Sequence, residues 1–139
     1  MKSVIATLMV FLSFGILPVL ASEKEDVAKA QDAARSWLAL TDSVKYSQSW
    51  DQAAAFFKAA VTKSDWEEAL KTVRSPLGTL KSRKVKAATF TSTLPGVPAG
   101  EYVVIQYDTQ FENKPSAVET ITTMREKDGS WKVAGYFIK

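Results

Sequence analysis

The sequence predicts an α+β domain in which three N-terminal helices pack on a curved, four-stranded antiparallel sheet. Two changes along the chain support this prediction. Between residues 24 and 74 apolar side chains recur at helical spacing, and from residue 80 onward they alternate with polar ones. The alternating segments are joined by short turns, which makes neighbouring strands antiparallel. With 139 residues, 46% of them hydrophobic, the chain suits one domain over residues 22–139.

Residues 1–21 are typical of a secretory signal peptide. Lys2 forms a short basic start, residues 4–17 are the apolar core, and Val19 and Ala21 occupy the −3 and −1 positions of a cleavage site. An uncleaved membrane anchor is the alternative, although the apolar run is just short of a comfortable span. Without Cys at the site, lipoprotein modification is excluded. We therefore expect a periplasmic or secreted protein with no membrane span after cleavage.

Three helices are expected in the first half of the mature chain. The first covers residues 24–42 and is followed by a connector at 44–47. The second covers residues 50–61, with Ser49 as its cap. The third starts at Ser64, where Ser-Asp-Trp-Glu can form a capping box, and stops before Pro76. The positions expected to face the core are Val27, Ala30, Ala34, Trp37, Leu38, Thr41, Ala53, Phe56, Phe57, Ala60, Trp66, Leu70 and Val73.

Four strands are expected in the second half. The segment Tyr-Val-Val-Ile-Gln-Tyr-Asp-Thr-Gln-Phe is rich in β-branched and aromatic residues and should lie inside the sheet. Turn signals separate it from its neighbours, and Asp128-Gly129 is a strong hairpin signal. The simplest sheet is a meander of residues 80–93, with a bulge near Ala87-Ala88, then 101–112, 117–126 and 131–138.

Hairpin registers decide which side chains share a face. We expect Thr109 opposite Glu119 and Tyr107 opposite Ile121 in one hairpin, and Ile121 opposite Tyr136 and Glu119 opposite Ile138 in the next. The face expected under the helices then carries Phe90, Val103, Ile105, Tyr107, Phe111, Ile121, Tyr136 and Ile138. The outer face carries Tyr102, Val104, Val118, Met124, Trp131, Val133 and Phe137, mixed with Thr89, Thr91, Thr120 and Thr122. This outer face is either a dimer or partner interface or an ordinary Thr-rich surface.

The composition excludes several classes of function. The chain has no Cys and no His, so disulfides, thiol nucleophiles, catalytic triads with His and His- or Cys-based metal sites are absent. Lys2 supplies one of the 18 basic residues, so residues 22–139 carry 17 basic and 15 acidic side chains. This near-balance offers no argument for nucleic-acid binding. We expect no metal, no cofactor and no catalytic residue.

Glu119 is the ionisable residue that most invites a functional hypothesis. The predicted register places it with Tyr107 and Tyr136 at the floor of a pocket between helices and sheet. A carboxylate beside phenols could act there as a base, although a structural ion pair with Lys or Arg is the plainer interpretation. Arg74, in the turn before the sheet, could bind a carboxylate or phosphate, or it could tie the turn to a helix C-terminus.

Two further patterns have competing interpretations. The basic run 81–86 could contact anionic lipid or polysaccharide, but positive side chains on an edge strand also prevent edge-to-edge pairing. Arg83 lies within this run. The aromatic residues of the helices could line a ligand cavity or form ordinary core: Trp37, Trp50, Trp66, Phe56 and Phe57.

Several motifs resemble one family of small exported bacterial proteins. They are Trp37, Trp66, Val-Arg-Ser-Pro-Leu-Gly at 73–78, Leu-Pro-Gly-Val-Pro-Ala-Gly-Glu-Tyr at 94–102, Glu-Thr at 119–120, and Asp-Gly-Ser-Trp-Lys-Val-Ala-Gly-Tyr at 128–136. Together they resemble domain of unknown function 4019. The resemblance implies no activity, because that family has no assigned function. The order of helices then curved sheet is similar to the NTF2-like or cystatin-like architecture, which hosts enzymes, carriers and interaction modules.

These observations favour an exported, non-catalytic envelope module that binds a protein partner or forms a homodimer through its sheet. The alternative is a small-molecule carrier, or an acid/base enzyme without His, that uses the pocket between helices and sheet. Whether the protein is an enzyme is left open by the sequence, with the balance toward no.

Overall fold

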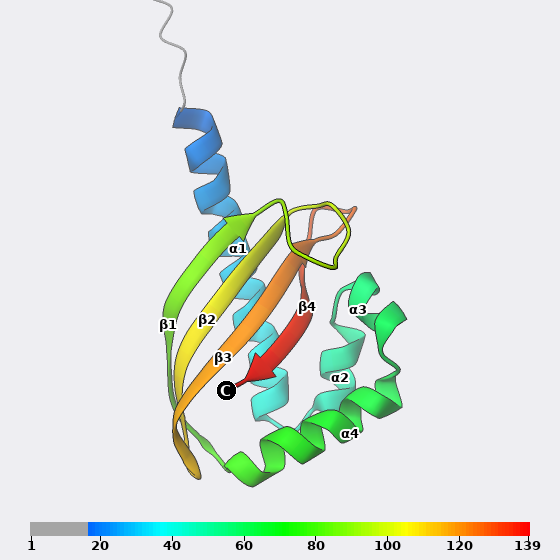
Figure 1. The fold of residues 1–139 in the computed structure, drawn as a ribbon, viewed down its shortest axis with the longest axis vertical. Coiled ribbons are helices and arrows are strands. Elements are labelled where there is room, and N and C mark those ends of the chain that lie inside the picture. Colours follow the sequence, from blue (N-terminus) through cyan, green and yellow to red (C-terminus); the bar gives the residue numbers. More distant parts are fainter. Residues whose placement is uncertain (1–16) are drawn as a thin grey trace, which may run out of the picture.

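A computed structural model describes the backbone of residues 17–139 and the side chains from Ser22 onward. Most of the predicted signal peptide, residues 1–21, lies outside this part. The described elements run in the predicted order, helices first and then a meander sheet of order β1-β2-β3-β4 (Figure 1). They are α1 (Leu17–Asp42), α2 (Tyr46–Asp51), α3 (Ala55–Ala60), α4 (Lys63–Arg74), a 3₁₀ turn (Ser75–Leu77), β1 (Leu80–Thr91), β2 (Tyr102–Phe111), β3 (Lys114–Arg125) and β4 (Trp131–Ile138).

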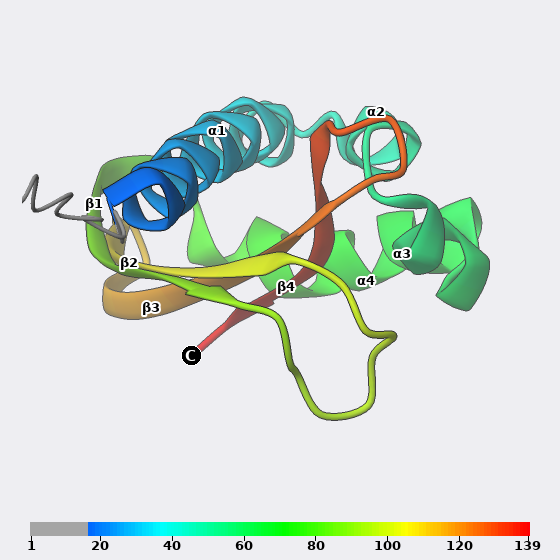
Figure 2. The same ribbon diagram turned by 90° about the horizontal axis from the view of Figure 1, so that it is seen from above.

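Helix α1 crosses one face of the sheet, while α2, α3 and α4 are grouped beside β4 (Figures 1 and 2). The predicted inner stripe of α1 is confirmed, since Ala30, Ala34, Trp37 and Leu38 are buried in the core. The helix begins at Leu17, earlier than predicted, and so extends into the predicted signal peptide. Among the described residues, no helix combines the length and the apolarity needed to cross a membrane.

The prediction of one continuous second helix over residues 50–61 is wrong. The structure has two short helices instead, and α2 already starts at Tyr46, inside the predicted connector. Ala54 separates them with extended backbone, and its N–H donates to the Val133 carbonyl of β4 at 2.8 Å. This tertiary hydrogen bond, made where Ala54 is fully buried, overrides the local preference for one continuous helix.

Two predicted helix caps are also displaced. Ser49 lies inside α2, where its hydroxyl donates to the Tyr46 carbonyl at 2.6 Å and accepts from Trp66 Nε1 at 3.0 Å. Helix α4 is capped by Thr62 rather than Ser64, and the Thr62 hydroxyl accepts from the Asp65 N–H at 3.2 Å. Thr62 and Ser64 each carry a hydroxyl three residues before an acidic residue, Asp65 and Glu67 respectively. The sequence pattern alone therefore could not choose between them as the cap.

The sheet confirms the predicted strand order and corrects one register. Tyr107 lies opposite Glu119, and Ile105 opposite Ile121, two residues away from the predicted pairing. The hairpin is tighter than expected, because Phe111 already pairs with Lys114. Since side chains alternate with a period of two, this shift leaves the paired residues of β2 and β3 on their predicted faces. The β1 bulge lies between Val85 and Ala87, next to its predicted place.

Strand β4 contains a bulge that changes its faces. Its second half has the predicted register, with Ile121 opposite Tyr136 and Glu119 opposite Ile138. Thr122 pairs with Gly135 but Thr123 pairs with Val133, which leaves one extra residue on β4. Trp131 and Val133 were predicted to face outward, and both are instead buried in the core under the helices.

The helices cover the predicted inner face, where Val103, Ile105, Tyr107 and Ile121 are buried. The outer face is less apolar than the sequence suggested. One reason is that Trp131 and Val133 of β4 do not lie on it. A second is that Tyr102 is only 1% exposed, and its hydroxyl donates to the Pro98 carbonyl in the β1–β2 loop. This loop projects on the side of the sheet away from α1 (Figure 2). Phe137 remains the large apolar side chain most exposed there, at 54%.

Candidate functional site

A buried ion pair joins strands β1 and β3 on the helix side of the sheet. Glu119 is fully buried, and Arg83 donates to it from Nε at 2.6 Å and from Nη2 at 3.1 Å. The Thr109 hydroxyl donates a further hydrogen bond to the same carboxylate at 2.5 Å. The Tyr136 hydroxyl donates to its other oxygen. Both carboxylate oxygens therefore have strong donors, as a buried charge requires.

Asp42 extends this pair into a network. It lies at the end of α1 and accepts from Arg83 Nη1 at 2.8 Å and from Arg74 Nη2 at 2.9 Å. Arg74 Nη1 also donates to the Thr41 hydroxyl at 3.1 Å. The guanidinium carbon of Arg74 lies over the Phe111 ring, 4.8 Å from its centroid. We call Asp42, Arg74, Arg83 and Glu119 the ion cluster. It holds two positive and two negative charges, so it is neutral as a whole.

The environment of the ion cluster shifts several pKa values. Burial alone would lower the pKa of Arg83, but the hydrogen bonds and charges of Asp42 and Glu119 outweigh it, so the pKa is raised. Burial raises the pKa of Tyr136, and the nearby negative charge of Glu119 raises it further. Burial also raises the pKa of Tyr107, against the opposing charge of Arg83. Both phenols therefore stay protonated and Arg83 stays charged at neutral pH.

The four residues predicted to line a pocket meet in or beside this network. Tyr136 bonds Glu119, Tyr107 lies opposite Glu119 with Arg83 over its ring at 6.0 Å, and Arg74 joins through Asp42. From the sequence, Asp42 was expected only as the last residue of a helix, and Thr109 only as a strand residue opposite Glu119. Arg83 was noted within a basic run. Arg83 shares its face of β1 with Val85, but Val85 is itself 51% exposed, so the alternation in this run did not mark Arg83 as an inward-facing residue.

A hollow of about 340 Å³ adjoins the ion cluster at the end of α1. Arg74 and Asp42 contribute to its wall, but their charges are already paired with each other. Arg74 Nε is buried without a hydrogen-bond partner among the described residues. The hollow is lined by Thr41, Asp42, Val44, Tyr46, Arg74, Ser75, Gly78 and Thr79.

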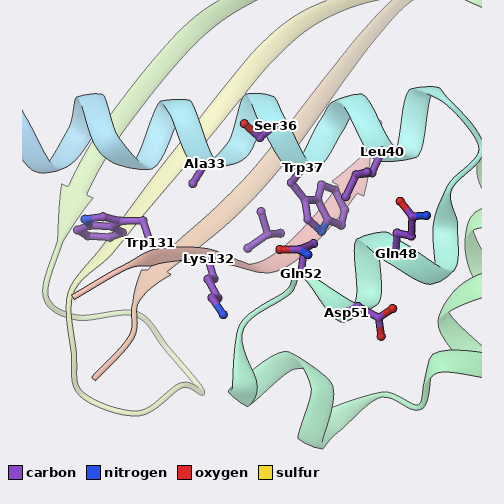
Figure 3. Close-up of a pocket in the computed structure, with 10 residues that line it drawn as sticks. Ala33, Ser36, Trp37, Leu40, Gln48, Asp51, Gln52, Trp131 and Lys132 are labelled. Atoms are coloured by element: carbon purple, nitrogen blue, oxygen red, sulfur yellow. The ribbon is translucent and has the colours of Figure 1, made fainter. Parts of the chain in front are cut away.

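A larger groove of about 450 Å³ lies between α1, α2 and β4 (Figure 3). Its walls combine aromatic and aliphatic surface with a few polar side chains. Figure 3 shows Trp37 in the middle of the lining residues, with Gln52 between Lys132 and Asp51. We call this hollow the α1–β4 groove. It is lined by Ala33, Ser36, Trp37, Leu40, Gln48, Asp51, Gln52, Trp131, Lys132 and Val133.

The polar groups of the α1–β4 groove fall into two sets, apart from the buried Trp131 Nε1, which has no hydrogen-bond partner among the described residues. Trp37 and Asp51 are already engaged, since Trp37 Nε1 donates to the Ser49 carbonyl at 2.8 Å and Asp51 pairs with Lys63 at 2.7 Å. Between residues 22 and 139, no side-chain hydrogen bond or ion pair uses the other set, which is Ser36, Gln48, Gln52 and Lys132. These groups are available to a ligand.

The sequence offered little sign of the α1–β4 groove. Of the aromatic residues considered for a cavity, only Trp37 lines the α1–β4 groove. Trp50 and Trp66 lie outside its lining, and their indole N–H groups donate to the Val61 carbonyl and to the Ser49 hydroxyl. Trp131 and Lys132 were missed because the β4 bulge determines how that strand meets the helices. Gln48 and Gln52 were missed because the helix break at Ala54 was not foreseen.

Comparison with known proteins adds a family but no activity. Within the described part of the chain, no group of three or more acidic side chains is arranged to hold a metal ion. No curated protein matches the sequence. Residues 33–136 match the family described as "Protein of unknown function (DUF4019)". This match covers most of the chain and includes every residue of the ion cluster and of the α1–β4 groove, so the protein belongs to the DUF4019 family.

Proposed function

We propose that this protein is an exported, non-catalytic binding module that holds a small ligand in the α1–β4 groove. The observation that carries the proposal is the contrast between the two polar sites. Both carboxylates of the ion cluster are fully engaged by hydrogen bonds and ion pairs within the chain, whereas the groove has polar side chains without partners beside an apolar wall.

The geometry of Glu119 argues against acid/base chemistry. A general base must reach the proton it removes and have a free lone pair. Glu119 is fully buried and accepts from Arg83, Thr109 and Tyr136. With no His or Cys anywhere in the sequence, the residues most often used as bases and nucleophiles are missing as well.

The groove has the dimensions and lining of a ligand site. Small-molecule sites typically enclose about 300–1,000 Å³ and combine apolar walls with a few polar groups. Here the 450 Å³ space has Trp37, Leu40 and Val133 as apolar wall, and Gln48, Gln52 and Lys132 can orient a bound molecule. The proposal thus retains the predicted pocket between helices and sheet, but moves it away from Glu119.

Native purification tests the proposal. The protein would be purified from its own cells without denaturation, and molecules released from it identified by mass spectrometry. Ser36→Trp would fill the groove from an exposed position of α1, and Ala39→Trp adds the same ring to an exposed position outside the groove. We expect a molecule to accompany the native protein and Ala39→Trp but not Ser36→Trp. The same molecule retained by Ser36→Trp would contradict binding in the groove.

Export is part of the proposal and has its own measurement. Cleavage after Ala21 would leave a mature chain that begins at Ser22. Intact-mass analysis of the protein from its native source should show this chain, and replacing Ala21 by a large residue, Ala21→Arg, should block processing. A full-length mass for the native protein in the cytosol would contradict export.

Self-association through the outer sheet face is a second candidate function. Phe137 is 54% exposed on β4, close to the half-buried Val118 and to Thr120 on β3. Light scattering at high micromolar concentration should then give a dimer, which Phe137→Ser abolishes. Phe56→Ser is the matched control, because Phe56 is exposed on α3 and away from the sheet face. A monomer for the unaltered protein would exclude this candidate.

A further inference from the structure

We propose that the ligand of the α1–β4 groove is an amphipathic organic anion, with its apolar body against the apolar wall of the groove and its acidic group at Lys132. This inference rests on the proposed function, because it names the chemical class that the groove would take. Three features of the groove carry it: a rigid apolar wall, one free cation and no free anion.

The apolar wall is held in place by the core behind it. Trp37 is 3% exposed, its indole N–H is held by the Ser49 carbonyl, and its ring meets Tyr136 edge-on at 5.2 Å. Val133 is 2% exposed and belongs to the same core. A wall that is already fixed loses little conformational entropy when a ligand packs on it. Trp37 and Val133 form the closed back of this wall, and the half-buried Ala33 and Leu40 offer apolar surface that a planar or compact group can contact.

Lys132 is the only charged group of the groove lining that lacks a direct partner among the described residues. The other one, Asp51, is paired with Lys63 at 2.7 Å, and its backbone carbonyl accepts from Lys58 at 3.4 Å. The nearest carboxylate along the chain is Asp128 in the adjacent hairpin, whose pKa is lowered first by hydrogen bonds from Ser130 and to a smaller extent by the charge of Lys132, although the two side chains form no ion pair. An acidic ligand can therefore bind Lys132 without breaking an existing ion pair.

A cationic ligand fits less well than an anionic one. Asp51 is the one carboxylate of the lining and its charge is already offset by Lys63, so a cationic ligand would gain less from it than from an unpaired carboxylate. The amides of Gln48 and Gln52 can each donate to a carboxylate as well as accept. One ammonium group with amide donors nearby matches the acceptor-only chemistry of a carboxylate.

Calorimetric titration of the mature protein tests this inference with two probes of nearly equal shape, 2-naphthoate and 2-naphthamide. We expect the acid to bind at least about tenfold more tightly than the amide, because only the acid can use the charge of Lys132. Lys132→Gln should remove this difference, and Lys132→Arg should retain it. Lys127→Gln is the matched control, since it removes the same charge from an exposed position of the same hairpin outside the groove.

The outcomes separate the inference from the proposed function. Equal binding of acid and amide, both lost in Ser36→Trp, would overturn the anionic class while leaving the groove as a binding site. A preference for the acid that survives Lys132→Gln would also overturn the role of Lys132. No saturable binding of either probe, or binding unaffected by Ser36→Trp, would overturn both the inference and the groove as the site. Circular dichroism of each variant confirms that its fold is intact.

Discussion

The ion cluster and the α1–β4 groove lie in the same layer, between helices and sheet, and both combine aromatic and polar residues. They differ in how their polar groups are used. In the ion cluster Glu119 receives donors on both oxygens and Asp42 bridges two arginines. In the groove the side chains of Lys132 and Gln52 have no partner among residues 22–139.

The difference teaches which polar groups serve folding and which are free for binding. A charge that is removed from water must be paired, because the desolvation penalty is several kcal/mol. A charge at the edge of an open groove keeps its water until a ligand replaces it. Mutations should therefore destabilise the protein at the ion cluster, and should alter only binding at the groove.

The largest expected effect follows from breaking the buried pair. Glu119→Gln removes the charge that compensates Arg83 and should cost about 3–5 kcal/mol of unfolding free energy. Urea denaturation measures this loss. Glu25→Gln, which removes a carboxylate from an exposed pair with Lys29, serves as the control and should leave the midpoint almost unchanged.

A double variant shows whether the loss belongs to the pair. Arg83→Gln combined with Glu119→Gln removes both charges, so its cost should fall below the sum of the two single costs by about 2 kcal/mol. Strictly additive costs would mean that the two side chains do not stabilise each other.

The next effect is a loss of stability in alkali. The pKa of Tyr136 is raised in the folded protein, so the unfolded chain releases this proton first. The stability contributed by protonated Tyr136 is complete below the unfolded tyrosine pKa of about 10, and it decreases as the pH rises above that value. The decrease should approach about 1.4 kcal/mol per pH unit for one such group. Tyr136→Phe should flatten this slope between pH 10 and 11, and an unchanged slope would contradict the assignment.

A smaller effect, of opposite sign, is expected where α1 ends beside the ion cluster. Val44 has a φ of 61°, and hydrogen bonds from Val44 and Lys45 to Thr41 and Leu40 close the helix there. This left-handed geometry favours glycine and costs a β-branched residue about 1–2 kcal/mol. Val44 is 67% exposed, so Val44→Gly loses little packing and should stabilise the protein by about 0.5–1 kcal/mol.

The same exchange in a regular helix provides the control. Val73 is 47% exposed inside α4, and Val73→Gly should destabilise the protein, since glycine is a poor helix residue. Thermal unfolding of the two variants should therefore shift in opposite directions. Destabilisation by both would show that the conformation of Val44 is not strained.

The smallest effects are expected in the groove. Lys132→Gln and Gln52→Ala change side chains without partners among the described residues, so each should alter stability by less than about 0.5 kcal/mol. Chemical denaturation checks this. A loss comparable to that of Glu119→Gln would mean that the groove, too, is a structural site, and the contrast between the two regions would disappear.

Much of the fold could be predicted because it depends on local patterns. The helical stripe of α1, the helix end before Pro76, the four strands and their order all follow from periodicity and turn residues. The sequence correctly predicted that Tyr107, Glu119 and Tyr136 share one face of the sheet, although the predicted β2–β3 register was wrong by two residues. A shift by an even number of residues leaves the faces unchanged.

The errors arise where distant parts of the chain meet. The helical segment is interrupted at Ala54, whose N–H donates to the Val133 carbonyl of β4. The bulge in β4 places Trp131 on the side of the sheet that faces the helices. The pairing of Arg83 with Asp42 and Glu119 joins residues far apart in sequence. No local pattern contains these contacts.

The sequence by itself determined that this protein is an α+β domain without Cys or His, with helices before a meander sheet. Such properties depend on composition and on the period of apolar residues, which are local. Only the tertiary structure decided that Glu119 is neutralised by Arg83 while Lys132 stays free. The physical reason is that burial and pairing depend on which side chains are packed against each other, and here a helix break and a strand bulge determine that packing.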